Sequence, residues 1–497
     1  MTVADTRVAE AAPQGTKRRI PVWLAIFAAS LPMFMATLDN LVMTNALPVI
    51  HRDLNADVEQ LQWFVNAYTL SFATFILMAV ALGDRFGRRT VFAIGITIFT
   101  VASVFAGFST TPAELIAARA VQGVGGAALM PLSLTLLAGS VAPRLRPLAI
   151  GIWGGVAGLG VALGPLIGGA VVQGWEWQAI FWINVPVGIV SVPLVLLTLP
   201  NSFGAKVRAD IVGLLLVGLG VLGIIFGIVR GNDAGWHSLQ VLASLIGGGA
   251  LLIAFIWWES RTKAPLVPLP LFRDRSFSVA NIVGFGFSFG MFGSVFILIQ
   301  FLQVVRGASP LDAAWQTTPW TMAPMVVAPL AGIIAPRVGT RILILLGLIF
   351  QATALFWLAA VMSPTVAYTA MLYPFILAGI GMGLVFSPSS TAVLSTMREE
   401  NRAKASGVNS TLREIGIALG IAVLTAVFTG AGGQLTPTGY VHAAVPAVMV
   451  GAAVVAATAI ASIFLPSGRL SRRPSTAQAV EQAEAGQGAA LQVERVS

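Results

Sequence analysis

The sequence contains no cysteine, only three histidines and few charged residues. Of its 497 residues 10% are charged, whereas a soluble protein carries about 25%. Without cysteine the chain forms neither disulfides nor thiolate metal sites. The histidines are scattered over segments predicted to be outer loops (His51, His237 and His442), so we expect no metal and no cofactor. No Gly-Lys dipeptide occurs, which argues against the phosphate-binding loop of ATP-driven pumps.

Long apolar stretches dominate what is present. Apolar residues make up 57% of the chain, and runs of 18 or more recur along it. Each run is long enough, as a helix, to cross about 30 Å of hydrocarbon. These runs do not alternate as the strands of a membrane barrel would. The sequence therefore predicts an all-α integral membrane protein, and the net charge of +9 reflects topology rather than binding of nucleic acid.

Fourteen transmembrane helices are predicted. They lie near 21–46, 60–82, 90–109, 113–138, 147–172, 178–199, 211–229, 239–258, 277–303, 313–335, 342–361, 367–391, 406–429 and 443–465. An even number places both termini on one side of the membrane. Lys and Arg concentrate in the loops of that side, leaving only Arg52, Arg230 and Arg306 in outer loops. Because such loops stay in the cytoplasm, we expect a multi-pass protein of the cytoplasmic membrane with both termini inside and no cleavable signal peptide.

Two similar halves flank a proline-rich inner loop. Arg85, Gly87 and Arg89 align with Arg337, Gly339 and Arg341 at one constant offset. Pairs of glycines in later spans align at nearly the same offset. The pattern predicts a cytoplasmic tail over 1–20, a six-helix bundle over 21–200, two inserted transmembrane helices over 201–260, an extended cytoplasmic connector over 261–276, a second six-helix bundle over 277–466 and a disordered cytoplasmic tail over 467–497. Such a duplication is typical of transporters whose two bundles rock around a shared site.

The loop after the second predicted span carries a specific pattern of charge and glycine. It reads Leu-Gly-Asp-Arg-Phe-Gly-Arg-Arg and contributes Gly83, Asp84, Arg85, Gly87, Arg88 and Arg89. Gly87 permits a tight turn, and Asp84 can pair with the arginines near the start of the next helix. A loop that only obeys the orientation rule would need the basic residues but not this Asp. The stretch resembles the signature loop of the major facilitator superfamily, which implies an inner gate.

Further motifs narrow the resemblance. Ala117 to Ala128 resembles the superfamily's fourth-span motif, with Arg119 and Gln122 in place. The fifth span resembles the antiporter motif, with Gly160, Gly164, Pro165, Gly168 and Gly169, although such a glycine stripe by itself only indicates tight packing. Leu38 to Pro48 and Trp175 to Gly188 resemble the fourteen-helix drug:proton antiporters of this superfamily. The resemblance implies a major facilitator fold and a role for Arg119 in proton coupling, whereas an arginine reaching for the outer interface is the alternative.

Asp39 is the acidic residue that the predicted spans place well inside the membrane, and we interpret it as the proton carrier. Burial penalises the charged carboxylate and so favours binding and release of a proton. Met35 and Met43 share its helical face, and with Asn40 and Gln122 they are predicted to line a substrate cavity. The alternative is an aspartate that is hydrogen-bonded for structure alone.

These features predict a proton-coupled antiporter that exports small amphipathic or cationic drugs or antibiotics by alternating access. Its partners are then a small-molecule substrate, protons and the lipid bilayer, and we expect it to work as a monomer. A dedicated exporter of one metabolite or of a self-made antibiotic is the alternative that the sequence leaves open. No catalytic constellation is visible in the spans, so we expect neither an enzyme nor a channel.

Overall fold

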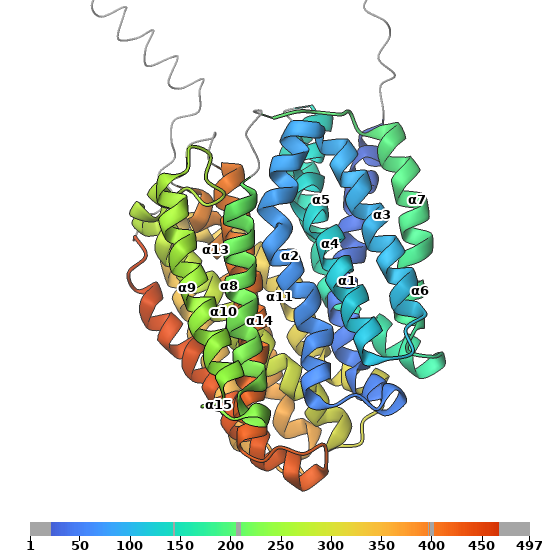
Figure 1. Ribbon diagram of the computed structural model, residues 1–497, viewed down its shortest axis with the longest axis vertical. Helices are drawn as coiled ribbons and strands as arrows, with labels where there is room; N and C mark the ends of the chain where they lie inside the picture. Colours follow the sequence, from blue (N-terminus) through green and yellow to red (C-terminus); the bar gives the residue numbers. More distant parts are fainter. Residues whose placement is uncertain (1–20, 143–144, 205–209, 396, 398–401, 467–497) are drawn as a thin grey trace, which may run out of the picture.

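Helices account for every regular element in the part of the chain that the structure describes. The structure is a computed structural model that describes residues 21–142, 145–204, 210–395, 397 and 402–466. Both ends of this described chain lie at the same end of the molecule, at the top of Figure 1. We call it the terminal end, and the opposite one the far end. The predicted tails over 1–20 and 467–497 lie outside the described residues.

The helices up to the inserted pair follow the predicted order. They are α1 (Val22–Leu54), α2 (Val58–Phe86), α3 (Arg88–Gly107), α4 (Pro112–Ser140), α5 (Arg146–Gly174), α6 (Ala179–Trp182), α7 (Asn184–Thr198), α8 (Ile211–Ala234) and α9 (Leu239–Arg261). At the far end α2 and α4 begin with capping boxes, in which Asp57 pairs with Gln60 and Thr111 with Glu114. Each box satisfies otherwise unpaired N–H groups of the first turn.

The second half repeats the arrangement. It comprises the short 3₁₀ helix η2 (Leu269–Arg273), α10 (Arg275–Val304), α11 (Pro310–Val338), α12 (Thr340–Val361), α13 (Tyr368–Ser395), α14 (Arg402–Gly430) and α15 (Pro437–Ser462). Thirteen segments of described residues are long and apolar enough to cross a membrane, with Ala179–Thr198 counted as one. The 29-residue α5 makes the fourteenth. The predicted helix count is therefore confirmed, although α1 continues to Leu54 instead of ending near residue 46.

The internal repeat is visible in mirrored contacts of matching glycines. Gly87 and Gly339 both adopt positive φ, of 102° and 94°, at the turns that join α2 to α3 and α11 to α12. Gly125 on α4 lies against the Gly95 carbonyl of α3, and Gly381 on α13 lies in the same way against Gly347 of α12. Equivalent backbones thus approach equally closely in both halves, as expected for a duplicated six-helix unit.

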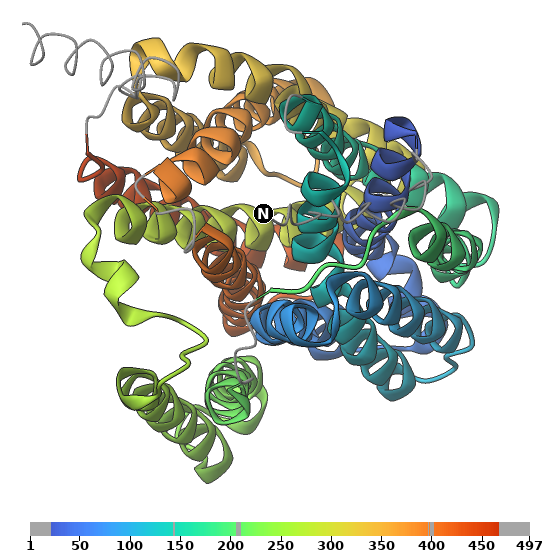
Figure 2. The ribbon, with the colours of Figure 1, turned by 90° about the horizontal axis from the view of Figure 1, so that it is seen from above.

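The inserted helices α8 and α9 pack mainly on each other and lie to one side of the two bundles (Figure 2). The fold class with two bundles and an inserted pair agrees with this arrangement, while the residue boundaries of the domains stay a prediction. The sequence predicted an extended connector, but the connector is not fully extended in the structure. Its Leu266 is buried against Met78 and Leu214, and η2 follows, because its apolar side chains have a surface on α2 and α8 to cover.

Two histidines also lie elsewhere than expected. His51 belongs to the last turn of α1 and His442 to the start of α15, since both helices extend further at the far end than the hydropathy of their spans indicated. Groups of three or more potential metal ligands were sought among the described residues, and none is found there.

Candidate functional site

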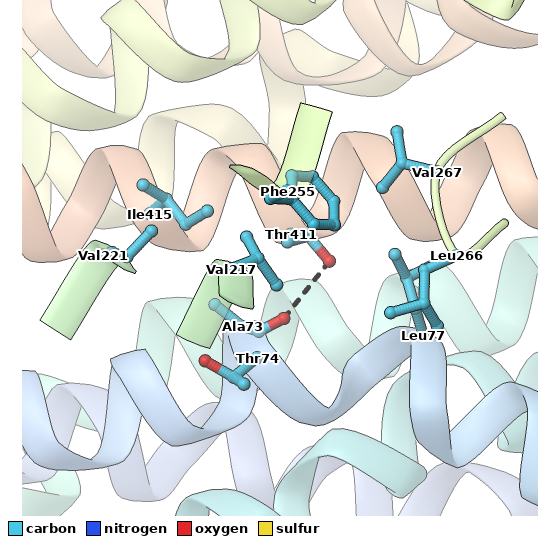
Figure 3. A pocket seen from close by; sticks show the side chains of 10 residues that line it. All are labelled: Ala73, Thr74, Leu77, Val217, Val221, Phe255, Leu266, Val267, Thr411 and Ile415. Atoms are coloured by element: carbon cyan, nitrogen blue, oxygen red, sulfur yellow. Dashed lines mark hydrogen bonds between the residues drawn. The ribbon is translucent and has the colours of Figure 1, made fainter. Parts of the chain in front are cut away.

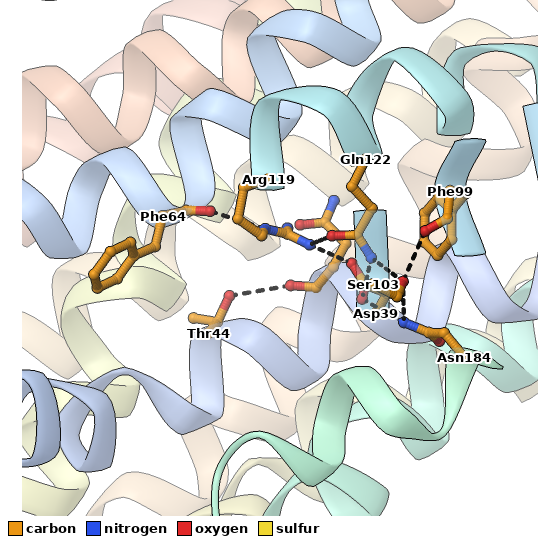
Figure 4. Close-up of polar contacts among 9 residues, drawn as sticks. Asp39, Thr44, Phe64, Phe99, Ser103, Arg119, Gln122 and Asn184 are labelled. Atoms are coloured by element: carbon orange, nitrogen blue, oxygen red, sulfur yellow. Dashed lines mark hydrogen bonds and ion pairs between the residues drawn. The ribbon is translucent and has the colours of Figure 1, made fainter. Parts of the chain in front are cut away.

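Asp39 lies at the centre of a buried polar cluster formed by four helices of the first bundle (Figure 4). Its Oδ2 is 2.5 Å from Nη1 of Arg119 on α4. Its Oδ1 accepts hydrogen bonds from Gln122 Nε2 at 2.9 Å and from Asn184 Nδ2 at 2.8 Å. Ser103 of α3 accepts from the same two amides. Asp39 is 3% exposed and Arg119 is fully buried. Three donors, from Arg119, Gln122 and Asn184, therefore surround the Asp39 carboxyl group in the interior of the bundle.

Arg119 is held by several contacts besides Asp39. Its Nε donates to the Phe64 carbonyl at 3.0 Å and its Nη1 to Gln122 Oε1 at 2.6 Å. The guanidinium carbon lies 4.4 Å from the centre of the Tyr68 ring. Its Nη2 is buried without a hydrogen-bond partner. The alternative of an arginine that reaches the outer interface is therefore wrong, because the charge is compensated inside the bundle by Asp39.

A cavity of about 770 Å³ lies between the two bundles. Its walls come from α1, α2, α4 and α5 on one side and from α10, α11, α13 and α14 on the other. Tyr68 lines it, so the ring that stacks on Arg119 separates the polar cluster from the cavity. The volume is large enough for a drug-sized molecule.

The predicted cavity residues are placed on two different faces of α1. Asn40 lines the cavity, and its contact with a substrate stays a prediction. Met35 and Met43 do not, because they share the face of Asp39, which packs into the bundle, and both are buried in hydrophobic clusters. Gln122 belongs to the polar cluster instead of the cavity wall. The lining face of α1 is the neighbouring stripe, which includes Met33 and Leu41.

The cavity contains two charged residues that the sequence analysis overlooked. Glu414 and Arg413 line it among the described residues. Arg413 lies 4.4 Å above the Phe386 ring, and Oε2 of Glu414 is buried without a hydrogen-bond partner. Because α14 begins at Arg402, Glu414 lies about 18 Å along the helix at 1.5 Å per residue. Asp39 is therefore not the only acid deep within the spans, and the position of Glu414 inside the span predicted over 406–429 was the available signal.

Asn45 closes the cavity at the far end. Its Nδ2 donates to the Pro165 carbonyl of α5 at 2.9 Å and to the Pro310 carbonyl of α11 at 3.1 Å. Gln303 of α10 donates back to the Asn45 carbonyl at 3.0 Å. One side chain thus joins both bundles, whereas Cβ atoms added at Gly151 and Gly155, toward the terminal end of α5, would meet open space. The cavity is closed at the far end and opens toward the terminal end.

The glycines of the predicted antiporter motif lie at close helix contacts of α5, and one of them takes part in this far-end closure. Cβ atoms added at Gly160, Gly164 and Gly168 would lie 2.8 to 3.1 Å from atoms of α1. Gly169 faces the other bundle, where an added Cβ would lie 2.6 Å from the Pro310 carbonyl oxygen. The stripe therefore packs α5 tightly on α1, and its last member packs on α11.

The loop between α2 and α3 holds the segment that follows α7. Arg88 forms an ion pair with Asp84 at 2.7 Å. Arg89 donates to the carbonyls of Leu196 and Leu199, and Gly204 N donates to the Asp84 carbonyl. Gly83 is buried against Leu132 of α4, and Arg85 stacks on its neighbour Phe86. All contacts named here stay within the first bundle.

The comparison with protein families decides the identity of this arrangement. The protein-family model described as "Major Facilitator Superfamily" matches residues 22–421 of the chain. The chain belongs to the major facilitator superfamily. It is therefore a many-span membrane transporter. Members of this superfamily are transporters and not enzymes, which agrees with the expectation from the sequence.

Curated members of the superfamily are similar over most of their length. Multidrug resistance protein Stp of Mycobacterium tuberculosis is 34% identical over 406 residues, which are 81% of this chain and 75% of that protein. The tetracenomycin C resistance and export protein of Streptomyces glaucescens is 32% identical over 86% of this chain and 79% of its own. A methylenomycin A resistance protein of Streptomyces coelicolor is 31% identical over 86% and 90%.

Solved major facilitator structures share the fold. A mutant of the nucleoside transporter NupG superposes with a TM-score of 0.62 at 14% identity and covers 89% of this chain and 99% of its own. The human organic anion transporter MFSD10 gives a TM-score of 0.57 at 13% identity, covering 91% and 100%. At these identities the likeness concerns the fold alone.

Gly87→Ala is expected to destabilise this facilitator. Gly87 has φ of +102°, and an added Cβ would lie 2.5 Å from the Asn201 side chain. Strain of this kind costs about 1 to 3 kcal/mol. Gly139→Ala is the matched control, because a Cβ there meets nothing within 4 Å and alanine favours a helix. Thermal unfolding of the purified variants should show a lower midpoint only for Gly87→Ala; equal midpoints would contradict the tight turn.

Proposed function

We propose that this facilitator is a proton-coupled antiporter that exports small amphipathic or cationic drugs and antibiotics across the cytoplasmic membrane. The observation that carries the proposal is a drug-sized cavity whose lining residue Asn40 directly follows the buried, ion-paired Asp39. Proton binding and cargo binding thereby act on the same turn of α1. Relatives named for multidrug resistance and antibiotic export support the cargo class.

The terminal end is the cytoplasmic end in this proposal, because the basic loops gather there. The conformation described above is then inward-open, ready to take cargo from the cytoplasm or the inner leaflet. Export requires the far end to open and the terminal end to close, as the two bundles rock around the cavity. We propose that a single chain suffices, since both bundles that form the cavity belong to it.

Asp39 couples the proton to this movement through Arg119. Protonation would remove the negative charge that compensates a fully buried guanidinium, and an unpaired buried charge is costly. Arg119 would then depend on the Phe64 carbonyl, Gln122 and the Tyr68 ring. This changes the packing of α4 against α1 beside the cavity. The proton thus favours one conformer and its release favours the other, which is the requirement for coupled transport.

The energy available is sufficient for drug export. One charge moving down 100 mV releases about 2.3 kcal/mol, and each pH unit adds about 1.4 kcal/mol. For an uncharged drug the two contributions together support a gradient of about several hundredfold for each proton. For a singly charged cation the exported charge offsets the electrical contribution, and one pH unit supports a gradient of about tenfold for each proton.

Transport into liposomes tests the proposal. Purified protein is reconstituted with an acidic lumen, and uptake of ethidium, which is permanently charged and does not follow pH by partition, is recorded. We expect uptake against a gradient that stops when an ionophore collapses the pH difference, and none in protein-free vesicles. Equal uptake with and without the pH difference would contradict proton antiport and indicate a channel or a uniporter instead.

Glu414→Gln is expected to separate charged from uncharged cargo. Oε2 of Glu414 has no hydrogen-bond partner, and the residue lines a mainly apolar cavity, where a hydrogen bond to a charged group contributes about 1.5 to 3 kcal/mol. Efflux of ethidium should therefore fall about 10- to 150-fold, whereas efflux of an uncharged drug such as chloramphenicol should change little. Ser390→Ala is the control, because Ser390 also lines the cavity but carries no charge. A parallel loss for both drugs would show that Glu414 does not recognise charge.

A dedicated exporter remains the second candidate. It is favoured by the relatives named after a single antibiotic, tetracenomycin C or methylenomycin A. A panel of structurally unrelated drugs in the liposome assay distinguishes the two, because a dedicated exporter moves one compound and a multidrug exporter moves several.

A further inference from the structure

The inserted helix α8 lies along the seam where the two bundles meet. Val221, Ile225 and Val229 of α8 form one buried apolar cluster with Leu70 of α2 and with Ala418 and Ala422 of α14. Because α2 belongs to the first bundle and α14 to the second, α8 contacts both across their junction. In Figure 2 α8 is seen beside both helices.

The same seam is filled toward the terminal end. The remaining space is a pocket of about 20 Å³ whose walls come from α2, α8, α9, the connector and α14. Figure 3 shows the side chains that line it. Next to it Thr411 Oγ1 of α14 donates to the Ala73 carbonyl of α2 at 3.3 Å. A space of this size holds about one water molecule, so α8 and the connector seal this side of the molecule.

Specific polar contacts fix α8 to both bundles near the far end. Arg230 Nη1 lies 3.0 Å from Glu59 Oε2 of α2. Two residues further on, Asn232 Nδ2 donates to the Ala426 carbonyl of α14 at 2.6 Å and to Thr429 Oγ1 at 2.7 Å. These contacts lie at the end where the cavity is closed. Opening of that end separates α2 from α14 and must break one of the two attachments.

We propose that the inserted pair is a strap that holds the far end closed, and that it releases Glu59 while it stays attached to α14. The Arg230–Glu59 pair is a single interaction whose side chains are 36% and 17% exposed. Asn232 makes two hydrogen bonds to α14, and the adjacent apolar contacts with Ala418 and Ala422 are fully buried. The strap biases the resting transporter toward the conformation that is open at the terminal end, without contacting the cargo.

Distances between spin labels test the strap. Since the chain has no cysteine, Glu176→Cys and Thr365→Cys place one label on each bundle at exposed far-end positions. The purified protein without drug should show mainly the short, closed distance. Arg230→Gln should raise the ratio of long to short distances about two- to fivefold, because the loss of a partly exposed ion pair changes the equilibrium by this amount. The charge exchange Glu59→Arg with Arg230→Glu should restore the original ratio.

Two further variants decide the outcome. Asn232→Ala, which cuts the attachment to α14, should also raise the long-distance fraction. Arg52→Gln should not, because Arg52 is an exposed far-end arginine that bonds within its own helix. The strap proposal is overturned if Arg230→Gln and Asn232→Ala both give the same distance ratio as Arg52→Gln. It is also overturned if the charge exchange between positions 59 and 230 does not restore the ratio that Arg230→Gln changes. The measurement needs no substrate, so its result tests the strap independently of the proposed transport activity.

Discussion

Asp39→Asn is expected to abolish proton-coupled drug efflux while the chain still inserts in the membrane. The change removes the charge opposite Arg119 and leaves a fully buried guanidinium uncompensated. Breaking a buried ion pair in this way costs about 3 to 5 kcal/mol. We therefore expect a lower thermal unfolding midpoint together with loss of ethidium efflux, both measured at matched amounts of protein in the membrane.

A double variant separates stability from coupling. Asp39→Asn with Arg119→Gln removes both charges and should recover most of the lost stability, since a neutral pair carries no unpaired charge. It should not recover efflux, because no group at this site can exchange a proton. Asp233→Asn, an exposed far-end carboxylate, is the control and should behave as the unmodified protein. Efflux by the double variant at the normal rate would remove Asp39 from the mechanism.

Gly169→Ala is expected to shift the transporter away from the closed far end. The new methyl group would lie 2.6 Å from the Pro310 carbonyl oxygen and 2.7 Å from Leu311 Cα on the other bundle. Overpacking costs about 1 to 3 kcal/mol, which lowers the ratio of closed to open far ends about 5- to 150-fold. Initial rates of ethidium efflux should fall accordingly, and labels at Glu176→Cys and Thr365→Cys should report longer distances.

Gly174→Ala is the matched control on the same helix, because a Cβ there meets nothing within 4 Å. A Gly169→Ala variant that keeps both the short distance and the normal efflux rate would contradict the packing of α5 on α11. A slower rate with an unchanged distance would also contradict it, since the predicted cause is the altered closure.

The sequence sufficed for the helix count, the repeat and the two charged residues of the polar cluster, Asp39 and Arg119. It did not indicate Ser103 and Asn184, which complete the cluster. Membrane helices are determined by local hydropathy, and a buried Asp39 or Arg119 is conspicuous in an apolar run. The direction in which each side chain points is a tertiary property. Met35 and Met43 were placed with Asp39 correctly on one face, but only the packing of α1 against α4 and α7 shows that this face is turned away from the cavity.

Glu414 and the connector illustrate the same limit. Arg413 and Glu414 lie within the span predicted over 406–429, but only the packing of α14 shows that both residues line the cavity. The prolines of the connector indicated an extended chain, yet Leu266 packs on α2 and α8. That packing partner comes from helices distant in the sequence, which no local pattern reveals. The link that α8 makes between the bundles is likewise a product of assembly.

The most direct test of the account is proton release on binding of drug. Purified protein in weakly buffered, mildly acidic detergent solution is mixed with ethidium while a pH indicator records free protons. The account predicts that the unmodified protein releases protons as drug binds and that Asp39→Asn binds drug without releasing them. Equal proton release by both proteins would contradict the assignment of Asp39 as the proton carrier.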